Sequence, residues 1–268
     1  MSRCIRRNKT DQTDPVACVR LLHWTLRATQ MLIVSAIVAV ANGRASGAAT
    51  INFSGYTWVV RPTGRGGPGP NDWEQANVSV DTNGFLHLRL TSVNGHWYCS
   101  EVYTQQRLGF GRYQFWINGR VDTMDRNVVL GLFNYPTFDV GKDGTHEIDI
   151  EFAQWGDSSA PHGNCTVWPT ATGGKQQTKP FSFALSGDVS GHEFIWSPTN
   201  VFFRTWDGLA DDDHHMLASW LFQPTNPATF ISRQPMPVHI NLWCFRGQAP
   251  RNGQPVELII RAFRFTPM

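Results

Sequence analysis

The sequence has few cysteines for its length, and none of them has the spacing of a metal site. Five occur among 268 residues, and two of these, Cys4 and Cys18, lie close to the N-terminus. The remaining three are Cys99, Cys165 and Cys244. In an exported protein this odd number allows either one disulfide with one free thiol or three buried thiols. No local Cys–His motif points to a thiol nucleophile.

The sequence also lacks, beyond about residue 50, any long segment with a helical period, any internal repeat and any linker. Short runs instead alternate apolar with polar residues and end at Gly, Pro, Asn or Asp. These runs span residues 86–90, 113–117, 127–133, 147–152, 193–196, 201–206, 238–243 and 256–265. Many short strands separated by turn signals predict one all-β domain over residues 49–268, built as an antiparallel sandwich or barrel.

Residues 1–48 do not have this pattern. Arg20 and Arg27 precede an apolar run of 11 residues at 31–41, and small residues follow at 45–49. This order is typical of a secretory signal, and the run is shorter than the roughly 20 residues that span a bilayer. We therefore expect a leader at 1–48, a secreted or periplasmic protein, and no stable membrane insertion once the leader is removed. An uncleaved anchor is the alternative.

The positive charge of the chain belongs to this leader. The whole sequence has a formal net charge of +2, but residues 1–48 hold seven basic and two acidic residues. The rest carries 16 basic and 19 acidic residues, which is a net charge of −3. A mildly acidic domain has no electrostatic attraction for phosphate backbones, so no nucleic acid is expected as a partner.

Three carboxylates at two-residue spacing stand out in the segment THEIDIEF at 145–152. On a strand, Glu147, Asp149 and Glu151 share one face, and the apolar residues between and after them share the other. Carboxylates aligned on one face repel one another, so folding alone gives little reason for them. Paired carboxylates with unequal pKa values are what glycoside hydrolysis requires. The motif therefore predicts carbohydrate cleavage, with an ordinary half-solvated strand as the alternative interpretation.

The aromatic content agrees with a carbohydrate ligand. Ten tryptophans follow the leader, and several lie in or just beyond the expected strands: Trp97, Trp116, Trp155, Trp168, Trp206 and Trp243. A flat aromatic with a polar handle suits the apolar C–H faces and the hydroxyls of a sugar. A single Trp is more often a core residue, but the set predicts that some of them line a groove beside the acidic strand.

Two other segments have simpler explanations. The glycine-rich stretch at 63–70 lacks the Gly-Lys-Ser/Thr ending of a phosphate-binding loop, and we interpret it as a surface loop at the rim of a cleft. The run DDDHH at 211–215 is typical of a solvated turn between strands. We assign no metal site to it, and no cofactor is predicted.

Several motifs in order along the chain resemble glycoside hydrolase family 16, in the branch with a regular E-x-D-x-E strand that includes lichenases and xyloglucan endotransglycosylases. The segment HEIDIEF matches the family's DEIDIEF at six of seven positions. The matching motifs are SEVY at 100–103, LGFGRY at 108–113, HEIDIEF at 146–152, FIWSP at 194–198 with VFFRTWDG at 201–208, and NLW at 241–243.

The resemblance implies a concanavalin-like jelly roll of two curved antiparallel sheets, with the concave sheet forming a cleft. It also implies hydrolysis of β-glucosidic bonds inside a polysaccharide with retention of configuration. By resemblance, Glu147 is the nucleophile and Glu151 the general acid/base, while Asp149 positions the nucleophile and modulates the proton balance. We expect the charges of Glu147 and Asp149 to raise the pKa of Glu151.

Substrate contacts follow from the same resemblance. The residues at positions similar to sugar-binding residues of lichenases are Glu101, Asn164, Asn241 and Trp243, and proximity to the motif strands adds Trp155 and Trp168. For Asn164 the alternative is a strand-end Asn that satisfies backbone groups. No calcium-binding motif supports the structural cation that some relatives hold.

Three positions depart from the family pattern. His146 replaces a carboxylate but faces away from the acidic set by alternation, Tyr103 replaces a sugar-contacting Arg, and Cys165 replaces an aromatic. The second change argues against strict specificity for mixed-linkage β-glucan. We therefore predict a monomeric endo-acting β-glucan hydrolase, with a transglycosylase or a non-catalytic carbohydrate-binding protein on the same fold as alternatives. The polysaccharide and its linkage stay open.

Overall fold

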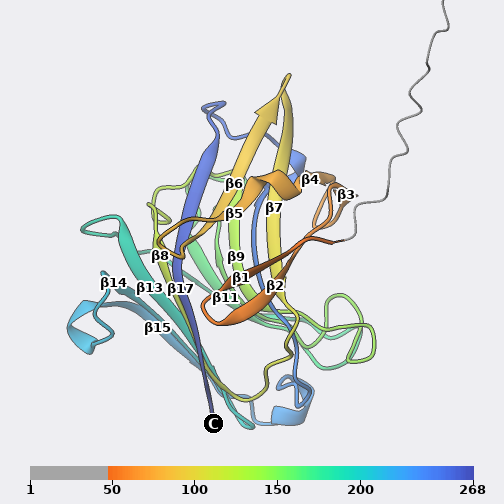
Figure 1. The fold of residues 1–268 in the computed structure, drawn as a ribbon. Coiled ribbons are helices and arrows are strands. Elements are labelled where there is room, and N and C mark those ends of the chain that lie inside the picture. Colours follow the sequence, from red (N-terminus) through yellow and green to blue (C-terminus); the bar gives the residue numbers. More distant parts are fainter. Residues whose placement is uncertain (1–47) are drawn as a thin grey trace, which may run out of the picture. The chain divides into compact units, whose positions relative to one another are not determined.

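The computed structural model describes residues 48–268, so nearly all of the predicted leader at 1–48 lies outside the described residues. Within 48–268 the regular structure is β, apart from single 3₁₀ turns (Figure 1). These turns are η1 (Gln75–Asn77), η2 (Asp213–His215), η3 (Pro227–Thr229) and η4 (Phe245–Gly247). No helix in this part of the chain has the length and hydropathy to cross a membrane. The all-β prediction is confirmed.

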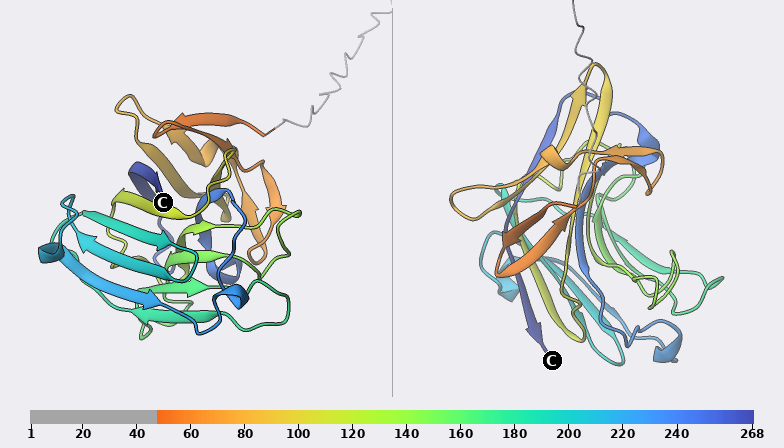
Figure 2. Two further views of the ribbon diagram at one scale, coloured as in Figure 1. Left: turned by 90° about the horizontal axis from the view of Figure 1, so that it is seen from below. Right: turned by 45° about the vertical axis from the view of Figure 1, so that its right-hand side comes forward.

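The strands form two layers that are each antiparallel throughout. The first layer has the order β1 (Thr50–Phe53), β2 (Tyr56–Val60), β7 (His96–Thr104), β16 (Val238–Cys244), β9 (Val128–Asn134), β10 (Ile148–Phe152), β11 (Gly163–Val167) and β12 (Gln177–Phe181). The second layer has the order β5 (Val78–Val80), β6 (Leu86–Val93), β17 (Val256–Pro267), β8 (Gly111–Asn118), β13 (Val189–Trp196), β14 (Val201–Asp207) and β15 (Met216–Phe222). Figure 2 shows the curvature of both layers from two further sides.

A hairpin joins the two layers. Strands β6 and β7 pair at Val93 and His96, and the two residues between them, Asn94 and Gly95, have φ values of 52° and 81°. Positive φ at both central residues gives the tight turn whose twist matches antiparallel strands, and Asn-Gly is the sequence that favours it. Two short strands, β3 (Gly64–Gly66) and β4 (Asn71–Trp73), complete this end, and β4 runs parallel to β7.

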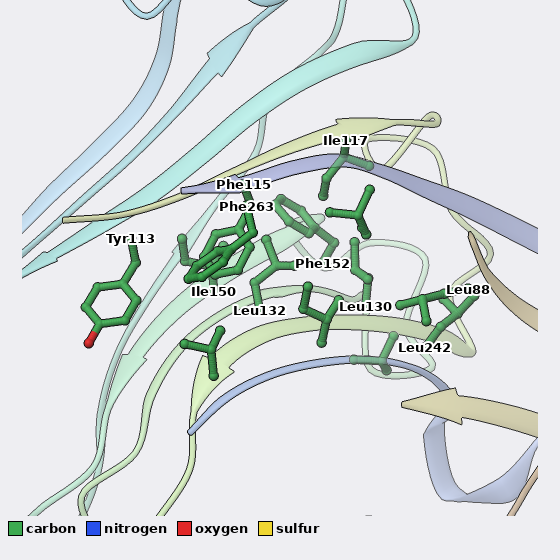
Figure 3. Close-up of a cluster of buried hydrophobic side chains, with 14 of the residues drawn as sticks. Leu88, Tyr113, Phe115, Ile117, Leu130, Leu132, Ile150, Phe152, Leu242 and Phe263 are labelled. Carbon is green, nitrogen blue, oxygen red and sulfur yellow. The ribbon is translucent and has the colours of Figure 1, made fainter. Parts of the chain in front are cut away.

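The hydrophobic core fills the space between the layers (Figure 3). Phe115 and Phe263 enter it from the second layer, and Leu132 and Ile150 enter it from the first; all four are buried. Side chains alternate along a strand, so the opposite face of the first layer is free to carry polar residues. That free face holds the acidic residues described below.

Every run predicted as a strand forms one. The strands outside those runs include the edge strands β1, β12, β5 and β15, and also β2, β7 and β11, which have a neighbour on each side. Strand β12 has the sequence QTKPF, which is mostly exposed and does not alternate. The three cysteines within the described residues, Cys99, Cys165 and Cys244, are free and buried. Of the two thiol states left open by the sequence, the structure has three buried thiols.

Candidate active site

The three carboxylates lie together on the face of β10 that points away from the core. Asp149 pairs with Phe133 of β9 on one side and with Thr166 of β11 on the other. Glu151 lies two residues further along the same face, and Glu147 directly precedes the strand. Ile148, Ile150 and Phe152 are buried in the core, so the expected alternation is present.

These carboxylates line a cleft of about 870 Å³ on the free face of the first layer. All nine residues predicted to be catalytic or substrate-binding line it: Glu101, Glu147, Asp149, Glu151, Trp155, Asn164, Trp168, Asn241 and Trp243. Of the six tryptophans considered for a groove, Trp97, Trp116 and Trp206 do not line it. Gly67 and Pro68 also line it, so the glycine-rich loop reaches the rim of the cleft. The structure thus brings together residues that are separated by up to 142 positions in the sequence.

One row of residues crosses the strands of the cleft floor, and we call it the floor row. Its members are, in spatial order, Arg61, Glu101, Asn241, Gly131, Glu151 and Asn164. Neighbouring strands lie about 4.8 Å apart, so each member is one strand spacing from the next. In this row Glu151 lies between Asn164, which carries an amide, and Gly131, which has no side chain.

Burial dominates the electrostatics of the acidic set. Removal from water raises the pKa of Glu147 to about 8 and that of Glu151 to about 7, and it raises the pKa of Asp149 well above its usual range. For Glu151 the cause is burial, opposed by a hydrogen bond from Asn164, and not the neighbouring charges expected from the sequence. Protons are therefore held by this set near neutral pH, as a general acid requires.

The surroundings of Asp149 favour its protonated form. Its Oδ2 accepts a hydrogen bond of 2.8 Å from the indole N–H of Trp168. Its Oδ1 is buried and meets no donor among residues 48–268, so an ionised Asp149 would leave a buried oxygen unpaired. A proton donated to Glu147 removes this penalty, and the bond lowers the pKa of Glu147 against the effect of burial. Asp149 thereby favours the ionised form of Glu147.

Asn164 is tied to side chains, not to the backbone groups that the alternative interpretation expected. Its Nδ2 donates to Glu151 Oε2 at 3.0 Å and to Thr166 Oγ1 at 3.3 Å, and its Oδ1 accepts from the indole N–H of Trp155 at 3.1 Å. Asn164 therefore orients Glu151 directly.

Glu101 has a different setting from the other carboxylates. Its Oε2 accepts from Arg61 Nη1 at 2.5 Å, and its Oε1 lies 2.8 Å from His239 Nδ1. Burial opposes ionisation of Glu101, but His239 and Arg61 outweigh it and hold its pKa below the usual range. Both carboxylate oxygens are thus occupied, so Glu101 acts on the cleft by fixing a His and an Arg beside it.

An aromatic group centred on His239 adds residues that the sequence analysis did not single out. The His239 ring stacks on Tyr103 at 5.0 Å and lies 5.1 Å from Phe133 and 5.6 Å from Tyr135, measured between ring centroids. A signal for His239 existed, because it precedes Asn241 by two residues and so shares its face. Arg61 had no such signal, since its place depends on the pairing of β2 with β7.

The three residues that depart from the family pattern lie in three different surroundings. His146 adopts a positive φ of 64° and its Nδ1 lies 3.0 Å from Ser232 Oγ, outside the residues that line the cleft. Cys165 is buried on the opposite face. Tyr103 supports His239 by stacking. The acidic set thus has no additional charged neighbour at position 146.

We predict that Gly131→Ala destabilises the protein by about 1–2 kcal/mol, although Ala normally favours a strand over Gly by about 0.5–1 kcal/mol. A Cβ at Gly131 would lie 2.6 Å from Asn241 Oδ1, which now accepts a 3.1 Å hydrogen bond from the Gly131 N–H. Urea unfolding would measure the change. In an Asn241→Ala background the same substitution should cost clearly less, because only the 3.3 Å approach to the Phe133 ring remains; an equal loss in both backgrounds would contradict the clash.

The fold and the cleft define a jelly-roll β-sandwich of the kind found in β-glucanases of known structure. The β-glucanase of Bacillus licheniformis matches with a TM-score of 0.60 and 20% identity over 83% of this chain and 100% of the other. A laminarinase from Flavobacterium sp. UMI-01 matches with a TM-score of 0.59 and 16% identity over 78% and 92%. The resemblance inferred from sequence motifs is confirmed at the level of the fold.

A third match has a different character. A Mycobacterium tuberculosis protein described as an immunostimulatory antigen and pseudo β-1,3-glucanase has a TM-score of 0.57 and 21% identity over 79% of this chain and 91% of the other. No protein-family model matches the chain, and no curated protein matches it in sequence. Since one fold hosts several functions, activity has to be argued from the site.

Proposed function

We propose that this chain is an endo-acting glycoside hydrolase that cleaves β-glucosidic bonds of a β-glucan type of polysaccharide with retention of configuration. The observation that carries the proposal is the set Glu147, Asp149 and Glu151, which lies on and directly before one strand in the floor of a cleft, with Asp149 buried and the two Glu half-buried, and which holds protons near neutral pH. Trp155, Trp168 and Trp243 line the same cleft and suit the apolar faces of sugars.

In the first step Glu147 attacks the anomeric carbon and the bond to the leaving sugar oxygen breaks. Glu151 donates its proton to that oxygen, so the leaving sugar departs as a neutral alcohol and a glycosyl-enzyme ester remains on Glu147. Asp149 supports the reaction by directing its hydroxyl proton at Glu147; this hydrogen bond opposes the rise in the pKa of Glu147 that burial causes, and so favours the ionised form that attacks.

In the second step Glu151, now ionised, accepts a proton from water while the water oxygen bonds to the anomeric carbon. The ester to Glu147 breaks, and the product has the configuration of the substrate. The hydrogen bond from Asn164 to Glu151 stabilises the ionised form in which Glu151 acts as the base. Burial favours the protonated form of Glu151, which the first step needs, whereas the Asn164 hydrogen bond favours the ionised form, which the second step needs.

The test is sugar release and product configuration on a panel of polysaccharides. The purified protein would be incubated with mixed-linkage β-glucan, laminarin, xyloglucan and agarose, and new reducing ends would be quantified. We expect turnover on at least one β-glucan, oligosaccharides as early products, and retained configuration by NMR. Binding without release on the whole panel would overturn the proposal.

Two alternatives share the same cleft. A transglycosylase would resolve the glycosyl-enzyme with a sugar hydroxyl in place of water, and added oligosaccharide acceptors would then increase product without new reducing ends. A non-catalytic carbohydrate-binding protein has a counterpart in the neighbour described as a pseudo β-1,3-glucanase. The presence of all three carboxylates favours catalysis, since sugar binding alone does not require them.

We further propose that the chain is exported and acts as a monomer. The basic, apolar and small-residue order of residues 1–48 supports export. N-terminal sequencing of the protein recovered from outside the cytoplasm should find a start near residue 48. Light scattering at several concentrations should give the mass of one chain.

A further inference from the structure

Trp155 occupies an unusual backbone position beside the cleft. It has a positive φ of 53°, and Gly156 follows with a φ of 83° in a turn closed by the Asp157 N–H donating to the Gln154 carbonyl at 2.9 Å. Such a conformation is disfavoured for a bulky side chain, so the surroundings have to hold it there. The ring of Phe245 lies 5.5 Å from the Trp155 ring, edge to face.

The indole of Trp155 determines which way the Asn164 amide points. An indole nitrogen can donate a hydrogen bond but cannot accept one. The atom of Asn164 that lies 3.1 Å from it must therefore be the carbonyl oxygen. The amide nitrogen then faces the other way, where it meets Glu151 Oε2 at 3.0 Å. Without the indole, the amide could turn and offer Glu151 an acceptor.

We propose that Trp155 is a positioning residue for Glu151: its indole N–H holds the Asn164 amide in the orientation that donates to the Glu151 carboxylate. This inference rests on the proposed function of Glu151 as acid and base. A donor at this place stabilises the ionised carboxylate that the second step needs. Trp155 thereby acts on a group that it does not touch, in addition to lining the cleft.

Other charges near Glu151 have to be separated from this effect. The titratable and charged groups facing it are Glu147 and Asp149 on its own strand side, His239 on β16, Glu101 on β7, Arg61 beside β2, and Tyr135 and Asp143 beyond β9. The flanking positions on β9 and β11 are Gly131 and Asn164, which carry no charge. Trp155 forms hydrogen bonds with none of the titratable groups within residues 48–268, so its substitution leaves their contacts in place.

The test is a carboxyl titration by NMR on the full chain with ¹³C-labelled Glu, in which Glu151→Gln assigns the signal of Glu151. Trp155→Phe keeps the ring contact with Phe245 and removes the N–H. We expect it to raise the titration midpoint of Glu151 by about half a pH unit or more, because the donor is no longer fixed. Asn164→Ala should raise the midpoint at least as much, and adding Trp155→Phe to it should change nothing further.

Two results would overturn the proposal. One is an unchanged Glu151 midpoint in Trp155→Phe while Asn164→Ala raises it; the other is an additional shift in the double variant. If Trp155→Phe fails to fold, the wild-type indole proton of Trp155 decides: it should titrate with the midpoint of Glu151 and lose that step in Glu151→Gln. An indole proton that ignores this titration contradicts the proposal.

The two hypotheses fail in different ways. Absence of sugar release by the wild type would remove the proposed function, and the titration would still decide whether Trp155 acts on Glu151 through Asn164. With an active wild type, the basic limb of kcat/KM should move upward in Trp155→Phe by the same amount as the NMR midpoint. A rise in KM alone would instead mark Trp155 as a sugar contact only.

Discussion

Glu147→Gln is expected to lower the rate of polysaccharide cleavage by at least about 10⁴-fold, while leaving the fold intact. The amide has nearly the same shape but cannot attack the anomeric carbon, so no glycosyl-enzyme forms. Reducing-end release on the best substrate of the panel would measure the loss. Gln can still accept one hydrogen bond from Asp149, so the geometry of the cleft should be unchanged. Oligosaccharide binding should therefore persist.

A matched control is Glu257→Gln in β17, which changes the same side chain in the other layer. Glu257 hydrogen-bonds His87 and Arg89 and does not line the cleft. This variant should keep wild-type cleavage. If Glu147→Gln retained more than a few per cent of the wild-type rate, Glu147 would not be the nucleophile.

The same Glu147→Gln substitution is expected to stabilise the protein, by about 2 kcal/mol at pH 8, which corresponds to about 5 °C in Tm. Burial raises the pKa of Glu147 to about 8, against an ordinary value of 4.5. Between these values the folded state binds more protons than the unfolded state. Stability therefore falls as pH rises from about 4.5 through 8, and the Gln variant lacks this loss. Glu147 retains some contact with solvent, so the gain is smaller than for a fully buried carboxyl.

Urea unfolding at several pH values would measure this gain. The difference between Glu147→Gln and wild type should be small at pH 4.5 and grow steadily up to pH 8. In contrast, His87 lowers the pKa of Glu257, so Glu257→Gln should show no gain over this range. A difference in unfolding free energy that does not change with pH would show that burial does not raise the pKa of Glu147.

Much of the fold could be predicted from the sequence because the alternation of side chains along a strand is a local property. The runs at 86–90, 113–117 and 147–152 put their apolar residues in the core, and the turn residues between them mark the strand ends. Edge strands escape this reasoning: β12 contacts one neighbour, stays exposed and includes Pro180, so no alternation is imposed on it.

The candidate site was predictable where one strand carries it and unpredictable where strands meet. That Glu147, Asp149 and Glu151 share one face follows from their two-residue spacing, whereas their proposed roles rest on the family resemblance. The pairing of Arg61 and His239 with Glu101 depends instead on the register of β2, β7 and β16, which no local pattern encodes. The source of the raised pKa of Glu151 was likewise hidden, because burial depends on the whole layer.

The floor row keeps the residues proposed to recognise the sugar, Arg61 and Glu101, apart from those proposed to act in the reaction, Glu151 and Asn164. Its members each belong to a different segment of chain, and they contact one another in three separate pairs: Arg61 with Glu101, Asn241 with the Gly131 backbone, and Glu151 with Asn164. Arg61 and Glu101 can change to suit another sugar substituent while Glu151 and Asn164 keep their partners. Under the proposed function, specificity can therefore change at one pair while the groups assigned to the chemistry keep their own partner.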